Sequence, residues 1–270
     1  MYIHVNGHKT YAYTGGKDFN PAQRTVVLIH GVLCDHSVWA LQSRYLANHG
    51  WNVLAIDLPG HCKSAGAPPA TVQEAAAFIQ ALLDAHGVKQ AALVGHSFGS
   101  LIALQTAANM GERISHVALV GTAYPMKVSQ GLLDASLNEP EKALHMTNVF
   151  SRSTLAPPSG AGSWVFGASL ALGRRVLASN KTVNVFHTGF NACNNYDQGL
   201  QAMAAVTCPV LMVLGEADQM TLPKNALPLI TQAKDSGKSL QVVTIPHGHH
   251  QMSESPDETL NALKRFLIGV

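Results

Sequence analysis

The stretch Leu93-Val94-Gly95-His96-Ser97-Phe98-Gly99 carries the strongest fold signal in this chain. An apolar run from Ala91 to Val94 leads into a serine that lies between two glycines, and a segment of good helix formers follows. This order predicts a strand, a tight turn and a helix, with the Ser97 hydroxyl held in a strained turn and presented to a cleft. Glycine is needed at both flanking positions because side chains there would collide where the strand meets the helix.

Strand and helix patterns alternate along most of the chain. Short runs rich in branched apolar residues are typical of strands buried on both faces. The alternation predicts a mainly parallel sheet with helices on both faces, preceded by an N-terminal hairpin. The expected strands are residues 3–5, 10–13, 25–29, 53–56, 91–94, 117–120, 209–214 and 240–245, and the expected helices are residues 38–49, 72–86, 98–109, 224–232 and 256–267.

Residues 125–206 interrupt this alternation, because no buried-strand pattern occurs there. Residues 132–144 and 165–177 have amphipathic helical patterns, whereas the Pro, Gly and Ser residues of 157–163 predict a flexible loop. We therefore expect two units. Residues 1–124 and 207–270 would form the core, and residues 125–206 would form a helical cap or lid over the cleft side of the sheet.

Composition excludes several classes of partner. The chain has 270 residues, a formal net charge of +2 and no run of Lys and Arg, so we expect no nucleic-acid partner. No apolar run approaches the roughly 18 residues that cross a bilayer, so we expect no membrane partner. The N-terminus lacks the apolar segment of a signal peptide, and we expect a cytoplasmic protein.

The four cysteines, Cys34, Cys62, Cys193 and Cys208, show no C-x-x-C spacing. Metal and redox sites need clustered thiolates, so this scatter favours free, mostly buried thiols. The histidines near residue 250 have no carboxylate or thiol cluster beside them that would suggest zinc. We expect no metal and no cofactor.

A serine hydroxyl becomes a good nucleophile only when a base takes its proton and a third group orients that base. Parallel sheets place such groups beyond the carboxyl ends of their strands. Asp218 lies just past the expected strand 209–214, with Glu216 as its nearest rival, and histidines 247, 249 and 250 follow the strand 240–245. The chain thus offers nucleophile, acid and base in the order Ser, Asp, His.

With that order and the Gly-x-Ser-x-Gly turn, the sequence resembles the α/β-hydrolase family. Ile29-His30-Gly31-Val32 is similar to the family's His-Gly loop, and residues 57–64 (DLPGHCKS) are similar to its D-x-P-G-x-G-x-S loop, with Cys62 at a usual glycine. Residues 248–256 (GHHQMSESP) resemble its G-H-x-x-x-x-E-x-P ending. The resemblance covers nearly the whole chain outside the insertion. It implies an α/β-hydrolase fold, with a mostly parallel eight-stranded sheet, helices on both faces and a helical cap insertion.

The resemblance also implies site residues. Ser97 would be the nucleophile, His249 the base and Asp218 the acid that orients it. His247 and His250 would be supporting loop groups, and His30 and His96 structural members of their motifs. The backbone N–H groups of Val32 and Phe98 would form the oxyanion hole, which stabilises the negative charge that develops on the substrate.

By its commonest activity, the family resemblance implies a carboxylesterase-like serine hydrolase that cleaves esters of small or medium apolar substrates through an acyl-enzyme. Serine at position 97 argues against dehalogenases and epoxide hydrolases, which use aspartate. A carbon–carbon bond (diketone) hydrolase, a cofactor-free perhydrolase and a ligand-binding receptor of the same fold stay open as alternatives. The candidate substrate contacts, for which ordinary packing is an equal explanation, are Trp164, Phe166, His187, Phe190 and Tyr196. The expected partner is a small-molecule substrate, and the chain could be a monomer or a homodimer.

Overall fold

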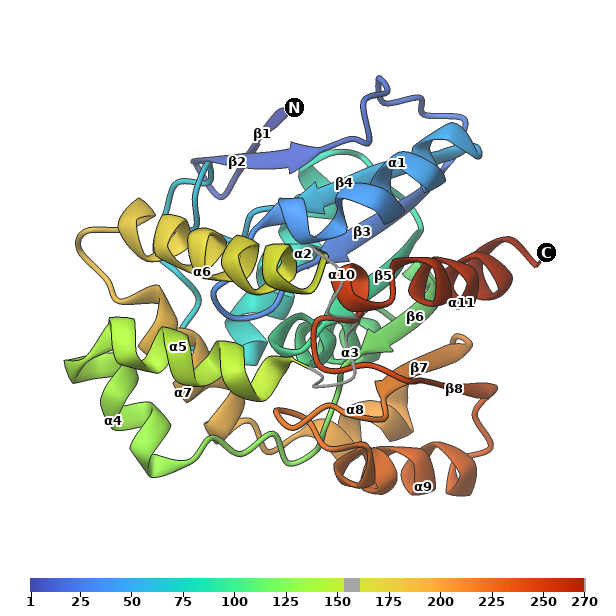
Figure 1. Ribbon diagram of the computed structural model, residues 1–270. Helices are drawn as coiled ribbons and strands as arrows, with labels where there is room; N and C mark the ends of the chain where they lie inside the picture. The colour runs from blue at the N-terminus through green and yellow to red at the C-terminus, as the bar shows by residue number, and fades with distance from the viewer. Residues whose placement is uncertain (153–160, 270) are drawn as a thin grey trace.

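The computed structural model describes residues 1–152 and 161–269, and for residues 161–164 it describes the backbone alone. In these residues eight strands form one sheet, in the order β1-β2-β4-β3-β5-β6-β7-β8 (Figure 1). The strands are β1 (Tyr2–Val5), β2 (His8–Tyr13), β3 (Arg24–Ile29), β4 (Trp51–Ile56), β5 (Ala91–His96), β6 (Ile114–Val120), β7 (Val210–Gly215) and β8 (Leu240–Ile245). Every predicted strand is therefore confirmed, with ends that move by at most a few residues.

In the spatial order of the sheet, the six strands β4, β3, β5, β6, β7 and β8 all run parallel to their neighbours. Only the N-terminal hairpin differs, since β1 pairs antiparallel with β2 and β2 pairs antiparallel with β4. Strands β4, β5 and β7 are buried along their whole length. Their continuous apolar runs suit a sheet that is covered on both faces. The predicted α/β-hydrolase fold is thus confirmed.

Helices cover both faces of this sheet. One apolar cluster joins the sheet to α1 (Ala40–Asn48) and α11 (Pro256–Ile268), and a second joins its other face to α2 (Val72–Ala85), α3 (Phe98–Met110) and α9 (Leu227–Asp235). The predicted helices 38–49 and 224–232 each begin with a short 3-10 turn, η1 (His36–Trp39) and η3 (Pro223–Ala226). A further 3-10 turn, η2 (Gly111–Arg113), follows α3, and the short helix α10 (Gln251–Glu254) follows β8.

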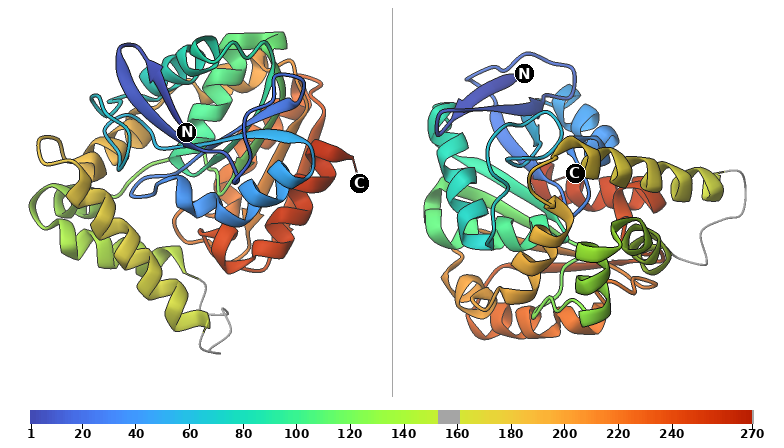
Figure 2. Two further views of the ribbon diagram at one scale, coloured as in Figure 1. Left: turned by 90° about the horizontal axis from the view of Figure 1, so that it is seen from above. Right: turned by 90° about the vertical axis from the view of Figure 1, so that its left-hand side faces the viewer.

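The chain between β6 and β7 forms α4 (Gln130–Asn138), α5 (Pro140–Ser151), α6 (Ala161–Ser179), α7 (Val185–Asn195) and α8 (Gly199–Ala205). Helices α4 to α7 pack around an apolar cluster that also includes Leu33 from the loop after β3, and they stand out from the sheet layers (Figure 2). We call these four helices the cap. Helix α8 differs, because its Ala202 and Met203 belong to the cluster around α2 and α3. The division of the chain at residues 125 and 206 stays a prediction.

Two expectations for this region need correction, and one helix was not expected. Residues 132–144 form two helices, because Pro140 cannot continue α4 and instead begins α5. Residues 161–163 of the predicted loop begin α6, whereas residues 157–160 lie outside the described residues. Residues 186–196, which have no helical expectation, lie almost entirely in α7. Within the described ranges, no helix is both long and apolar enough to cross a membrane.

Candidate active site

Ser97 occupies a strained turn between β5 and α3, which we call the elbow. Its backbone has φ +53° and ψ −119°, a region that residues with side chains rarely adopt. A Cβ on Gly95 would overlap the carbonyl oxygen of Gly99, and one on Gly99 would overlap the carbonyl of Ile29. The two glycines therefore let α3 begin directly against the ends of β5 and β3, and the serine stands at the junction.

Asp218 and His249 meet beyond the ends of β7 and β8. The Nδ1 atom of His249 lies 2.8 Å from Oδ2 of Asp218, and both side chains are almost fully buried. Glu216, the rival acid, is exposed. Because the carboxylate accepts the Nδ1 proton, the other ring nitrogen of His249 remains the basic one.

Thr221, which has no predicted role, completes the surroundings of the acid. Its hydroxyl donates to Oδ2 of Asp218 over 2.7 Å, while the backbone N–H groups of Met220 and Thr221 both donate to Oδ1 over 2.8 Å. Burial alone raises the pKa of Asp218, but the charge of His249 and these donors outweigh it, so the pKa lies below its ordinary value. The carboxylate is held ionised and in one orientation.

His96 and Ser151 hold the backbone of His249. His96, which precedes the elbow serine, donates from Nε2 to the carbonyl oxygen of His249 over 2.8 Å. The N–H of His249 donates to the carbonyl oxygen of Ser151 over 2.8 Å. Next to this loop, a Cβ on Gly121 would lie 3.2 Å from Nδ1 of His249. The Ser97 backbone N–H bonds to Val120, the neighbour of Gly121, so the end of β6 links the serine and the histidine.

The segment His30-Gly31-Val32 runs beside the elbow. A Cβ on Gly31 would lie 3.1 Å from Cβ of Ser97, and Val32 lines the same cavity as Ser97. Phe98 is the first residue of α3, where backbone N–H groups point outward and the helix dipole favours negative charge. In the described part of the chain, neither Val32 nor Phe98 has a backbone acceptor for its N–H. These two donors are suited to an anionic oxygen next to Ser97.

A cavity of about 250 Å³ opens at Ser97, between the core and the cap. The core contributes Val32, Ser97 and residues from the loops after β6 and β7, and the cap contributes residues from α4, α5 and α7. Most of the walls are apolar or carry sulfur. The lining residues are Val32, Ser97, Met126, Lys127, Val128, Ser129, Leu132, Met146, Phe150, Phe190, Cys193, Gln219, Met220 and Thr221.

Of the predicted substrate contacts, the structure brings Phe190 to this cavity. His187 pairs instead with the hydroxyl of Ser136 over 2.9 Å, inside the cap. Tyr196 is buried and donates its hydroxyl to Gln105 over 2.9 Å. Phe166 is half-buried on α6 and does not line the cavity, and the side chain of Trp164 lies outside the described residues. The lining methionines were not predicted, because their spacing in sequence shows no pattern.

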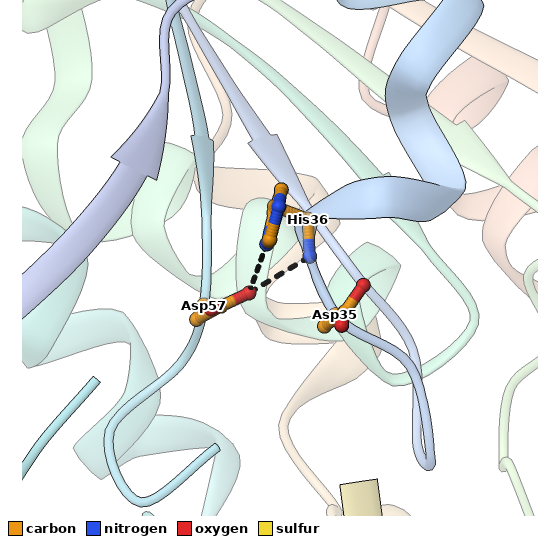
Figure 3. Close-up of side chains that lie close together, drawn as sticks. All are labelled: Asp35, His36 and Asp57. Carbon is orange, nitrogen blue, oxygen red and sulfur yellow. Dashed lines mark hydrogen bonds and ion pairs between the residues drawn. The ribbon is translucent and has the colours of Figure 1, made fainter. Parts of the chain in front are cut away.

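A second cluster of polar side chains, Asp35, His36 and Asp57, lies where β4 ends and η1 begins (Figure 3). Their potential ligand atoms lie within 4.8 Å of one another, which raises the question of a metal. Asp57 accepts from the backbone N–H and from Nδ1 of His36 over 2.9 and 2.7 Å. Asp35 accepts from Ser37 and from Arg175, and its carboxylate points away from Asp57. The carboxylates are engaged with protein donors, and we assign the cluster to loop structure.

The other members of the sequence motifs also have structural contacts. His30 accepts at Nε2 from the backbone N–H of Leu58 over 3.1 Å, and burial lowers its pKa. Cys62 has φ +45°, which explains why glycine suits this position in the motif. Ser255 pairs with Nδ1 of His247. None of the cysteines forms a disulfide, and burial raises the pKa of Cys62 to about 12.

Known proteins are similar to this chain in sequence and fold. A family model described as alpha/beta hydrolase fold matches residues 24–157. The chain is 27% identical to the dihydrolipoyllysine-residue acetyltransferase component of the acetoin cleaving system of Cupriavidus necator, aligned over 96% of the chain but 66% of that protein, less than two thirds of its length. It is also 27% identical to a pimeloyl-(acyl-carrier protein) methyl ester esterase of Neisseria meningitidis serogroup A, over 94% of the chain and 80% of the esterase.

A solved structure extends the likeness to the whole fold. The enol-lactonase from Burkholderia xenovorans LB400 superposes with a TM-score of 0.82 at 21% identity, covering 99% of this chain and all of that one. The parallel sheet, the elbow at Ser97 and the matching family model agree with one another. The chain belongs to the α/β-hydrolase family.

Proposed function

We propose that this protein is a serine hydrolase that cleaves carboxylic esters of small or medium apolar substrates through an acyl-enzyme. The observation that carries the proposal is the buried pair of Asp218 and His249, whose backbone is held by His96, the residue directly before the strained Ser97. This arrangement supplies a nucleophile, a base and a group that orients the base. The relative from Neisseria meningitidis, an esterase by its name, supports ester cleavage.

The chemistry follows from the protonation state of His249. Its basic nitrogen takes the proton of the Ser97 hydroxyl as the serine oxygen attacks the ester carbonyl. The carbonyl oxygen becomes an anion that the N–H groups of Val32 and Phe98 stabilise. The histidine then returns the proton to the departing alcohol, which leaves an acyl group on Ser97. Water, deprotonated by the same histidine, releases the acid and restores the enzyme.

The cavity supports an apolar substrate of limited size. At about 250 Å³ it lies near the lower end of small-molecule sites. Its methionines, Met126, Met146 and Met220, have flexible side chains that adapt to ligands of varied shape. Lys127 is the cationic lining residue, and its ammonium already donates to the carbonyl of Asn194 over 2.7 Å. These walls favour a neutral substrate.

A panel of substrates tests the proposal. We expect p-nitrophenyl esters of two- to six-carbon acids to turn over, with kcat/KM falling for acyl chains of twelve or more carbons, because the cavity cannot enclose them. A vinylogous diketone and a peracid-forming assay complete the panel. Turnover of the diketone without ester cleavage would replace the ester assignment with carbon–carbon hydrolysis. No turnover of any substrate would favour a ligand-binding role.

A further inference from the structure

The end of helix α5 reaches from the cap to the loop that carries His249. Ser151 is the last residue of α5, and its carbonyl oxygen accepts the N–H of His249 over 2.8 Å. Arg152 follows directly, and its guanidinium lies 3.5 Å from a carboxylate oxygen of Glu254. The side chains of Arg152 and Glu254 are only 10% and 1% exposed, so this ion pair is buried between cap and core.

Glu254 in turn holds the residues on either side of His249. Its carboxylate accepts the backbone N–H of Gly248 over 3.3 Å and that of His250 over 3.2 Å. Residues 246–250, between β8 and α10, form the loop that we call the histidine loop. Three consecutive N–H groups of this loop are thus fixed, two by Glu254 and one by Ser151. Such hydrogen bonds set the conformation of a loop that has no regular secondary structure. Arg152 faces the carboxylate of Glu254, which accepts two of these bonds.

The junction is polar rather than apolar. Arg152 also contacts the hydroxyls of Ser169 on α6 and Ser253 on α10. At the end of α5, Oδ1 of Asn148 and Oγ of Ser151 are buried, as is Nε of Arg152 directly after the helix, and none of these atoms has a partner in the described part of the chain. Apolar packing tolerates sliding, whereas directional bonds to a buried charge specify one arrangement. The cap therefore meets the histidine loop through contacts that set its position.

We propose that Arg152 is a positioning residue for the reaction: it holds Glu254, which fixes the turn that presents His249 to Ser97, so that placement of the histidine depends on the seating of the cap. The inference rests on the proposed function, because it assigns His249 the role of base. Small displacements of a catalytic group lower rates steeply, by up to about 100-fold for 1 Å. Loss of the guanidinium should therefore lower the rate of the chemical steps rather than the affinity for substrate.

The test compares Arg152→Met with Arg152→Lys and with a cap control, Arg174→Met. Arg174 pairs with Glu141 on the exposed surface of the cap, so its removal leaves the histidine loop untouched. We expect Arg152→Met to lower kcat for p-nitrophenyl butyrate and the rate of fluorophosphonate labelling at least tenfold, with KM within twofold. Arg152→Lys should recover most of both rates, and Arg174→Met should stay within twofold of the wild type.

Several results would overturn the inference. Labelling and kcat of Arg152→Met within twofold of the wild type would do so, as would a loss that Arg152→Lys does not recover at all. Should Arg152→Met fail to fold, Glu254→Gln is measured in its place, and an unchanged kcat there would also contradict the inference. A wild-type protein that neither hydrolyses esters nor reacts with fluorophosphonate would refute the proposed function itself, which separates the two failures.

Discussion

Individual side chains at this site act through the neighbours that the fold gives them. The sequence could place Ser97, Asp218 and three histidines at one edge, because they follow strands of one parallel sheet whose carboxyl ends share that edge. The resemblance to the family's ending then singled out His249. Thr221 and Arg152 could not be identified in this way. Thr221 is one of several polar residues in its loop, and nothing in the sequence singles it out as a partner of Asp218. Arg152 matters because it pairs with Glu254, a residue about 100 positions away that only the tertiary structure brings near.

Buried histidines make the protein sensitive to acid. Burial lowers the pKa of His61 to about 4 and that of His96 to about 3, from 6.5. Below pH 6.5 the unfolded chain therefore binds protons that the folded protein excludes, and the free energy of unfolding falls by about 1.4 kcal/mol per pH unit for each histidine. Between pH 7.5 and 5.0 we expect urea unfolding to show a loss of about 2 kcal/mol for each.

A variant separates this effect from other titrations. His61→Asn removes a group that titrates only on unfolding, so its free energy of unfolding should fall by about 2 kcal/mol less than that of the wild type over the same pH range. The exposed His145 provides the control, and His145→Gln should follow the wild type. An identical pH dependence for His61→Asn and the wild type would contradict the explanation.

Helices and strands were predictable where their pattern is continuous. Apolar runs located β3 to β7, because a strand buried on both faces is rich in apolar residues. Alternation located the hairpin of β1 and β2, and branched residues located β8, although this edge strand is only partly buried rather than buried on both faces. The cap was harder. Helix α4 has only nine residues, and Pro140 divides what the apolar spacing alone joins. Helix α7 was not predicted because Gly189 and the asparagines Asn191 and Asn194 have low helix propensity, and tertiary packing decides such a segment.

The junction of β5 and α3 gives a direct test of how glycine shapes the elbow. Gly95→Ala places a methyl group on the carbonyl of Gly99, a backbone atom that cannot move without displacing α3. We expect a loss of several kcal/mol in the free energy of unfolding, or no folded protein, by urea titration. Gly131→Ala is the matched control: its Cβ meets nothing within 4 Å on helix α4, so the change should be neutral or stabilise by up to about 1 kcal/mol. Equal stability of the two variants would contradict this account of the elbow.

Across the whole molecule, the core and the cap contribute different parts of the candidate site. In the proposed reaction the core supplies the reacting groups and the N–H donors, and the cap lines the cavity with residues from α4, α5 and α7. The sequence predicted a cavity between the two, but the lining residues depend on how the cap sits, which no spacing in the sequence encodes. The contacts from Ser151 to His249 and from Arg152 to Glu254 make that seating part of the proposed chemistry.

Intact-mass spectrometry after reaction with a fluorophosphonate tests the central claim most directly. The probe reacts with a serine only where a base has activated it, so we predict one adduct on the wild-type protein, located at Ser97 by peptide mapping. Ser97→Ala, with its fold checked by circular dichroism, should remain unmodified. An unmodified wild-type protein, or an adduct of equal yield on Ser97→Ala, would contradict the assignment of Ser97 as an activated nucleophile.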